Sequence, residues 1–164
     1  MDQITPAPVA PDLRTRIEDF LAGIAAAVDD DRLEDWPGFF AEDATYRIIP
    51  RDAFEAGQPI GILSCFERGM MQDRVLALRT ANIFEPHTYC HLLARPLLSR
   101  TADGAIAARS HFALCRTQQG GRSELFATGK YLDRIVTQDG ALLLAGREVV
   151  LESHLVDILI VLPV

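Results

Sequence analysis

The sequence predicts one α+β domain in which a curved antiparallel sheet wraps around helices in the shape of a cone. Apolar residues recur at helical spacing through roughly the first half of the chain. The second half contains long β-prone runs separated by short glycine-containing turns. With 164 residues, of which 49% are hydrophobic and 24% charged, the chain has the length and composition of a single folded domain.

The first residues favour an extended arm, which we predict over residues 1–11. Its three prolines fix φ and remove backbone donors that a helix would use. The domain is expected to span residues 12–164 and to open with a helix capped by Asp12. The apolar face of this helix should consist of Leu13, Ile17, Phe20, Leu21, Ile24 and Val28.

Two further helices are predicted from capping-box spacings. Asp31 and Glu34 would open a short second helix, and Ser64 and Glu67 would open a third. The side chains expected to face the core are Leu33, Trp36, Phe39 and Phe40 in the second helix, and Phe66, Met70 and Ala77 in the third.

Strands are predicted before the third helix and throughout the second half. A first strand over residues 44–49 is followed by a loop over residues 51–59. The pairs Asp103-Gly104, Gly120-Gly121 and Asp139-Gly140 readily take the positive φ of hairpin turns. They separate strands expected at residues 89–99, 105–117, 122–137 and 141–152. Because long strands usually need bulges to curl, bulges are expected at Gly129 and Gly146.

Charge and hydropathy argue against several classes of partner. The chain has a formal charge of −7 and contains no block of basic residues, so nucleic acid is not an expected partner. No apolar run approaches the roughly 18 residues that span a bilayer, and no positively charged leader opens the chain. Cys65, Cys90 and Cys115 are odd in number and widely spaced, which favours reduced thiols. We therefore expect a cytoplasmic protein without a membrane partner.

The histidines and cysteines do not form a recognisable metal site. A mixed iron–sulfur centre needs two Cys and two His, and a mononuclear iron site needs two His and a carboxylate. Cys90 directly precedes His91, so these two are not spaced to converge on one iron. Pro86 favours an extended segment, in which His87, Tyr89 and His91 would share one face as a polar cluster. We expect no metal or cofactor on this chain.

A cone of this kind could instead enclose a pocket whose polar side chains act as general acid or base. Turn formation explains Asp43, and packing within strands explains Tyr46 and His111. No Ser-His-Asp order and no phosphate-binding glycine loop occurs. The sequence leaves this alternative open, with Asp43, Tyr46, His87, His91 and His111 as its candidates.

Some charged and apolar segments suit contacts between subunits. Arginine is enriched at interfaces because its guanidinium pairs with carboxylates through two hydrogen bonds. The last eight residues are almost wholly apolar, so this tail should dock on the chain's own core or on another subunit, and we favour the second. The interface candidates are Arg51, Asp73, Arg74, Arg79, Phe84, Pro86, His87, Tyr89, His91, Ile158, Leu159 and Leu162.

Five short motifs together resemble the small (β) subunits of aromatic-ring-hydroxylating dioxygenases. They are residues 35–40 (DWPGFF), 43–47 (DATYR), 73–79 (DRVLALR), 82–89 (NIFEPHTY) and 127–133 (ATGKYLD). The resemblance extends from about Ile17 to Val164 and is nearest to members that act on aromatic carboxylates such as terephthalate, anthranilate or benzoate. One departure is Cys90 before His91, where the family often has arginine.

The resemblance implies a cystatin-like or NTF2-like cone that serves as the structural small subunit of an oxygenase. The partner would be a large (α) subunit that carries a [2Fe-2S] Rieske cluster and a mononuclear Fe(II), commonly as α3β3. Such a complex dihydroxylates an aromatic acid with O2 and NAD(P)H. Isomerases and dehydratases share the same cone, so a free-standing enzyme of that type is the alternative function.

Overall fold

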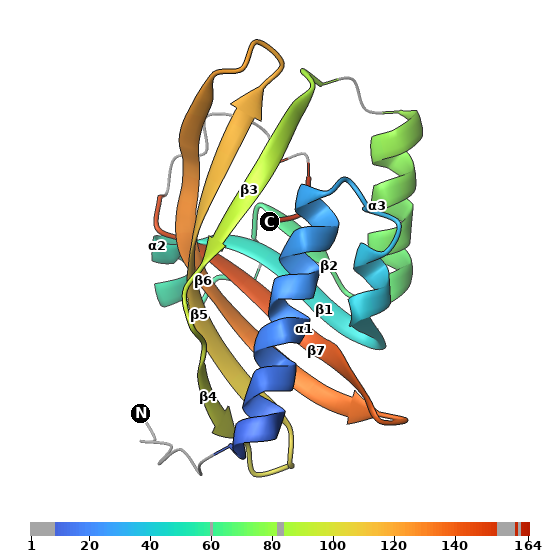
Figure 1. Ribbon diagram of the computed structural model, residues 1–164, viewed down its shortest axis with the longest axis vertical. Coiled ribbons are helices and arrows are strands. Elements are labelled where there is room, and N and C mark those ends of the chain that lie inside the picture. The colour runs from blue at the N-terminus through green and yellow to red at the C-terminus, as the bar shows by residue number, and fades with distance from the viewer. Residues whose placement is uncertain (1–8, 60, 82–83, 154–159, 161) are drawn as a thin grey trace.

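The computed structural model of the chain describes all residues except 1–8, 60, 82–83, 154–159 and 161. The described residues form three α-helices and one 3-10 helix that lie against a single curved sheet (Figure 1). The helices are α1 (Pro11–Asp29), η1 (Trp36–Phe39), α2 (Arg51–Glu55) and α3 (Arg68–Thr80). The strands are β1 (Phe40–Pro50), β2 (Leu63–Cys65), β3 (His87–Leu93), β4 (Leu97–Arg100), β5 (Ile106–Gln118), β6 (Ser123–Gln138) and β7 (Ala141–Leu151).

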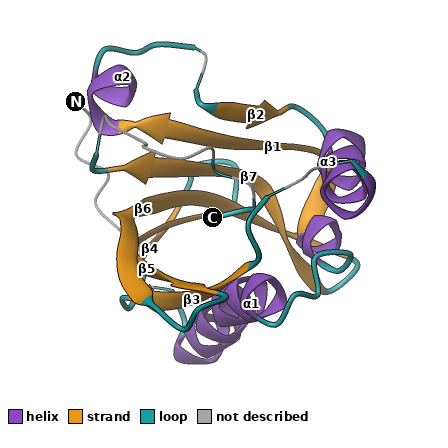
Figure 2. Ribbon diagram, turned by 90° about the horizontal axis from the view of Figure 1, so that it is seen from above, coloured by secondary structure: helices purple, strands orange, loops and turns teal. Residues whose placement is uncertain are grey.

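The sheet curls into an open cone, which confirms the predicted α+β architecture. Its strand order is β2-β1-β7-β6-β5-β3, and β4 also pairs with β5. Figure 2 shows the strands bending around the interior, with α1 along the open side of the curve and α3 beside β1 and β2. The interior between these elements is where a pocket would lie in such a fold.

The sheet is mixed, so the prediction of a wholly antiparallel sheet is wrong. β1 pairs with β7 in parallel, and the pair places Tyr46 opposite Arg147. The other neighbouring strands pair antiparallel. β1 and β7 are far apart in the sequence and are not joined by a hairpin turn. No turn motif could therefore predict whether they pair in parallel or antiparallel.

α1 begins at Pro11, one residue before the predicted capping residue Asp12. The missing N–H of proline is tolerated there, because the first N–H groups of a helix have no partner within the helix. Asp12 lies in the first turn, and no side chain caps this end. The buried face contains Ile17, Leu21 and Ile24, as the apolar spacing predicts.

The two capping-box predictions are wrong. Asp31 has φ of 56°, and the segment after it forms only the short η1, although its aromatic side chains enter the core as expected. Ser64 lies in β2, and α3 begins at Arg68 after Glu67, whose side chain forms no capping hydrogen bond. α3 also turns a different face inward than the sequence predicts. Its buried residues are Met71, Val75 and Leu78, whereas Phe66 and Met70, expected in the core, are exposed.

Three predictions about loops and strands also need correction. The predicted loop over residues 51–59 contains the short helix α2. The predicted strand over residues 89–99 is two strands, β3 and β4, because Pro96 lies between them and cannot donate to the sheet. The predicted hairpin turns are confirmed, with positive φ at Gly104, Gly121 and Gly140.

The two glycines predicted at bulges behave differently. The register of β6 and β7 shifts between Arg134 and Ile135 and leaves Ala145 beside Gly146 unpaired, which confirms a bulge there. Gly129 instead lies in regular register opposite Phe112. A Cβ added at Gly129 would lie 2.9 Å from the Phe112 ring and closer still to the carbonyl oxygen of Val150. Close packing, and not a bulge, requires glycine here.

Gly129→Ala should therefore lower the free energy of unfolding by about 1–3 kcal/mol, the usual effect of overpacking a core. Gly120→Ala is the matched control, since a Cβ there meets no atom within 4 Å. Urea unfolding followed by circular dichroism measures both variants. Equal stability of the two variants would show that the sheet relaxes around the added methyl group.

None of the described helices is long and apolar enough to cross a membrane.

Candidate functional site

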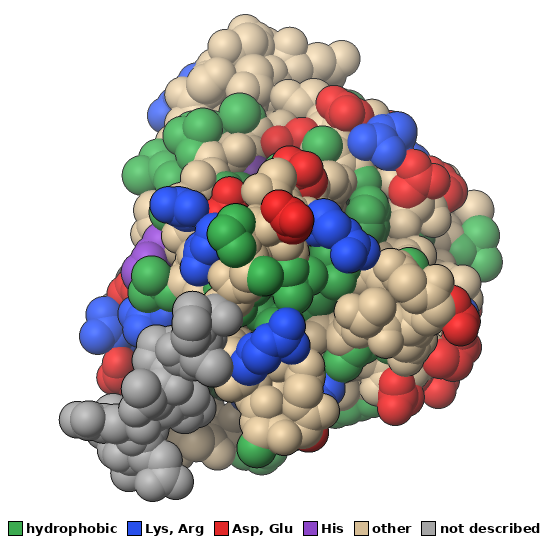
Figure 3. Space-filling view, turned by 60° about the horizontal axis from the view of Figure 1, so that its bottom comes forward, with side chains coloured by type: hydrophobic (Ala, Val, Ile, Leu, Met, Phe, Trp, Pro, Cys, Tyr) green, Lys and Arg blue, Asp and Glu red, His purple; other side chains and the backbone are tan. Residues whose placement is uncertain are grey.

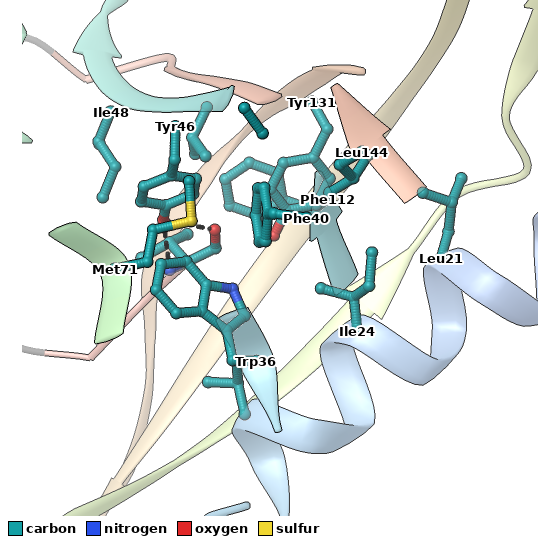
Figure 4. Close-up of a cluster of buried hydrophobic side chains, with 14 of the residues drawn as sticks. Leu21, Ile24, Trp36, Phe40, Tyr46, Ile48, Met71, Phe112, Tyr131 and Leu144 are labelled. Carbon is teal, nitrogen blue, oxygen red and sulfur yellow. Dashed lines mark hydrogen bonds between the residues drawn. The ribbon is translucent and has the colours of Figure 1, made fainter. Parts of the chain in front are cut away.

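The interior of the cone is the natural place for a pocket, and aromatic side chains fill it. The ring of Trp36 meets the ring of Tyr46 edge to face, with 5.0 Å between centroids, and meets Phe40 at 5.3 Å. Phe112 and Tyr131 stack with centroids 4.4 Å apart. Figure 4 shows these side chains converging from the sheet and from η1.

Little space remains among them. A cavity of about 10 Å³ lies between α1 and the inner face of the sheet. A site of roughly 10–15 Å³ holds about one water molecule, whereas pockets for drug-sized ligands have about 300–1,000 Å³. The space among these aromatic side chains is therefore too small for a substrate.

A buried ion pair lies on the wall of this interior. Arg147 and Asp133 face each other across β6 and β7 and are joined by two hydrogen bonds of 2.7 and 2.8 Å. The Arg147 guanidinium also lies 4.3 Å from the centroid of the Tyr131 ring. Burial alone would lower the pKa of Arg147, but the charge and hydrogen bonds of Asp133 outweigh it and raise this pKa. The pair serves to join the two strands.

Tyr46, a candidate acid or base, has a structural role. Its hydroxyl donates to the carbonyl oxygen of Val164 at 2.9 Å and accepts from the N–H of Val164 at 3.0 Å. Burial raises the pKa of Tyr46, and burial also raises the pKa of Tyr131. Neither phenol is therefore suited to proton transfer near neutral pH.

His91 joins β3 to the end of α1. Its Nδ1 lies 2.6 Å from one oxygen of Asp29, and its backbone N–H donates to the other oxygen at 2.8 Å. The side chain of His91 is only 2% exposed. Both groups are thus engaged in a contact between two elements. Asp29 was not predicted as a functional residue, because only the packing of α1 on β3 shows its partner.

His87, Tyr89 and His91 share one face of β3, as predicted. Ring centroids are 5.1 Å apart for His87 and Tyr89, and 6.2 Å apart for Tyr89 and His91. Burial raises the pKa of Tyr89 to about 12. By contrast, Asp43 and His111 are exposed on the surface. The five candidate acid or base residues therefore do not meet in one pocket.

Several interface candidates hold this chain's own elements together. Arg79 makes hydrogen bonds to Glu34 and Asp31, which joins α3 to the segment after α1. The hydrogen bond from Arg79 holds the pKa of Glu34 at about 2. Arg74 donates to the carbonyl oxygen of Ile160 at 2.9 Å.

Of the other candidates, some are buried and some are exposed. Arg51 pairs with Glu55 and Glu152. Phe84 and Tyr89 pack on the core, whereas Asp73 and Pro86 are exposed.

The structure partly corrects the prediction that the C-terminal tail docks on another subunit. Ile160, Leu162 and Val164 are 3%, 8% and 3% exposed and belong to the chain's own core. Leu162 is therefore not available to dock on another subunit, because it already covers this core. Ile158 and Leu159 lie outside the described residues.

The donor groups of the described residues do not gather as a metal centre would require. Among the residues that the structure describes, no three His, Cys, Asp or Glu side chains come close enough to hold a metal ion. Cys65, Cys90 and Cys115 are free thiols, and Cys65 is buried.

Comparison with known proteins was made for sequence and for structure. Residues 24–157 match the family model described as ring hydroxylating beta subunit. The small subunit of anthranilate 1,2-dioxygenase from Burkholderia cepacia is 36% identical over 84% of this chain and 85% of its own length. The beta 1 subunit of the terminal oxygenase component of terephthalate 1,2-dioxygenase from Comamonas is 38% identical over 90% of this chain and 96% of its own.

Solved structures agree with these matches. A beta subunit assigned to an aromatic-ring-hydroxylating dioxygenase from Novosphingobium aromaticivorans superposes with a TM-score of 0.86 and 31% identity, covering 96% of this chain and all (100%) of that one. A protein from the same organism, assigned as a scytalone dehydratase, has a TM-score of 0.66 at 17% identity, covering 87% of this chain and 89% of that one. The second likeness is one of fold alone, and it places the chain among NTF2-like cones.

Proposed function

Because this chain belongs to the family of ring-hydroxylating beta subunits, we propose that it is the structural small subunit of an aromatic-acid dioxygenase and has no turnover of its own. The observation that carries this proposal is the filled interior of the cone. Aromatic side chains and Val164 leave a cavity of about 10 Å³ where a free-standing enzyme of this fold would bind substrate. The alternative of an isomerase or dehydratase is less well supported, because the candidate residues Asp43, Tyr46, His87, His91 and His111 do not meet in one pocket.

The redox chemistry then belongs to a large (α) subunit. That subunit would hold the [2Fe-2S] Rieske cluster and the mononuclear Fe(II), which together supply electron transfer and oxygen activation. The substrate class is an aromatic carboxylate, by analogy with the anthranilate and terephthalate relatives. We propose an α3β3 assembly in the cytoplasm that receives electrons from NAD(P)H through an electron-transfer partner.

This chain contributes rigidity to such an assembly. The Arg147–Asp133 pair joins two long strands, the Asp29–His91 contact joins α1 to the edge of the sheet, and Tyr46 anchors Val164. Each contact fixes elements that are distant in sequence, so the outer surface keeps one shape. A fixed surface suits a subunit whose role is to support a neighbour.

Part of the predicted interface remains available for such contacts. Asp73 and Pro86 are exposed, and Leu76 on α3 is 61% exposed although it is large and apolar. We propose that this surface contacts another subunit. Arg74, Arg79 and Tyr89 would then position the surface without touching the partner themselves.

Coexpression with a large subunit encoded beside this chain tests the proposal. Oxygen uptake with a panel of aromatic carboxylates should require both chains, the electron-transfer partner and NAD(P)H, and this chain alone should give none. The contrary result would be turnover by the isolated chain that His91→Ala reduces by about 10²–10⁴-fold without loss of fold, as expected for a general base. That result would establish the free-standing enzyme instead.

A further inference from the structure

Most of the charged side chains around the open hollow at the β4 end of the molecule are already paired within the chain. This hollow lies where β4 meets the first turns of α1 and has a volume of about 1060 Å³. Figure 3 views this end and shows hydrophobic side chains with charged side chains of both signs around them. Arg14 and Arg95 both lie beside Glu18, and Arg134 pairs with Asp103. Chemistry that the proposed function does not use lies elsewhere, on the outer face of the sheet.

Two cysteines face each other across β3 and β5. Cys90 of β3 lies directly opposite Cys115 of β5 in the antiparallel register. Directly opposite residues of an antiparallel pair point to the same face of the sheet, with Cβ atoms about 4.5–5.5 Å apart. Cys90 is exposed and Cys115 is partly exposed, and both are free thiols. They are therefore neighbours that a small reagent can reach from outside.

The ladder of hydrogen bonds brings this pair within reach of a disulfide. The N–H of Ala94 donates to the carbonyl oxygen of His111 at 2.9 Å, so these two residues form a hydrogen-bonded pair. Such pairs recur at every second position, so Cys90 and Cys115 also form one, with Cα atoms about 5.5 Å apart. Disulfides usually join Cα atoms about 4.4–6.8 Å apart and Cβ atoms about 3.5–4.5 Å apart. The two strands need only approach each other slightly.

β3 is able to make this small movement. Among the described residues it pairs with β5 alone, so its other edge adjoins no strand. That edge is held by the contact of His91 with Asp29 of α1. An edge strand held by few contacts shifts more readily than a strand paired on both sides. A disulfide formed in this way retains some strain, and strained disulfides are easily reduced.

The third cysteine lies apart from this pair. Cys65 is in β2, and β2 and β3 are at opposite ends of the strand order. Cys65 is 4% exposed, and burial raises the pKa of its thiol. Since the thiolate is the reactive form of cysteine, Cys65 should stay reduced under conditions in which the other two react.

We propose that Cys90 and Cys115 are a redox modification site, which closes to a reversible disulfide when the chain meets hydrogen peroxide. The thiolate of Cys90 attacks one peroxide oxygen and becomes a sulfenic acid, and the leaving hydroxide takes up the proton that the thiol released. The thiol of Cys115 then attacks the sulfenic sulfur, which forms the S–S bond and releases water. Two thiols and one hydrogen peroxide thus give one disulfide and two water molecules.

The bond ties the free edge of the sheet to its centre. Cys90 directly precedes His91, which holds the end of α1, so the disulfide fixes the strand to which this helix is attached. Neither a substrate nor a large subunit takes part in the reaction, so the site does not depend on the proposed function.

Mass spectrometry and thiol titration of the full-length chain test the site. After treatment with hydrogen peroxide, the chain should lose the mass of two hydrogen atoms and yield a peptide pair joined through Cys90 and Cys115. The thiols titrated after unfolding should fall from three per chain to one, and dithiothreitol should restore all three.

Two variants separate proximity from general reactivity of the thiols. Cys90→Ser should abolish the disulfide. Cys115→Ser/Thr117→Cys keeps three cysteines but moves one to the diagonal position, about 7–8 Å from Cys90. Cysteines with Cα atoms more than about 7 Å apart cannot be bridged without movement of the backbone, so this variant should form the disulfide about tenfold more slowly or not at all. Circular dichroism of each variant verifies that the fold is retained.

Three results would overturn the proposal. Oxidation of Cys90 to a sulfinic acid while Cys115 remains a thiol shows that the two sulfur atoms do not meet. A disulfide-linked dimer on a non-reducing gel, in place of the internal bond, shows that Cys90 reacts with a second copy. Equal rates for the wild type and Cys115→Ser/Thr117→Cys show that the register does not select the pair. Each of these results leaves the proposed function as it stands.

Discussion

Replacing Arg147 with methionine should lower the free energy of unfolding by about 3–5 kcal/mol, because Asp133 would remain as a buried carboxylate without its partner. The two side chains are 5% and 0% exposed, and two hydrogen bonds join them. Urea unfolding followed by circular dichroism measures the loss.

Two comparison variants separate the buried charge from other effects. Arg134→Met removes an arginine that pairs with Asp103 at the surface, and exposed pairs contribute only about 0–1 kcal/mol. Arg147→Met/Asp133→Leu removes both charges and should recover most of the stability, since apolar residues often replace a buried pair without loss. A small loss in Arg147→Met alone would mean that water reaches Asp133.

Trp36→Ala should lower the free energy of unfolding by about 3–5 kcal/mol, the usual effect of removing a buried tryptophan. Trp36 is fully buried and packs against Phe40 and Tyr46. Removing the indole leaves a cavity in the interior of the cone, which Trp36 fills in the wild type. Trp36 is the only tryptophan of the chain, so the variant has no tryptophan fluorescence to follow. Chemical unfolding should therefore be followed by far-ultraviolet circular dichroism.

Added indole gives this prediction a second readout. If the space is a defined cavity, free indole should raise the melting temperature of Trp36→Ala and leave the wild type unchanged, because a ligand that binds only the folded state stabilises it. Phe66→Ala, at a side chain 65% exposed, should change stability by no more than about 0.5 kcal/mol. Collapse of the core around the missing ring would appear as a small loss without an indole effect.

Local sequence signals predicted those features whose physical cause is local. Gly104, Gly121 and Gly140 have the positive φ that their hairpin turns require. The apolar spacing of α1 predicted its buried face because one helical period relates neighbours on the same element. The start of α3 was predicted too early because Ser64 lies in β2, and its buried face was decided by how the helix packs on the sheet, which no local signal records.

By itself, the sequence determined the class of fold, the hairpin turns of the second half, the aromatic composition of the core and the family. Only the tertiary structure decided what the cone contains. The contacts that fill and brace it join residues far apart in the chain, 62 positions for Asp29 and His91 and 118 for Tyr46 and Val164. Spacing along a chain records the period of one element, whereas these contacts depend on how separate elements come together. The direction of β1 beside β7 and the burial of Leu162 were decided in the same way.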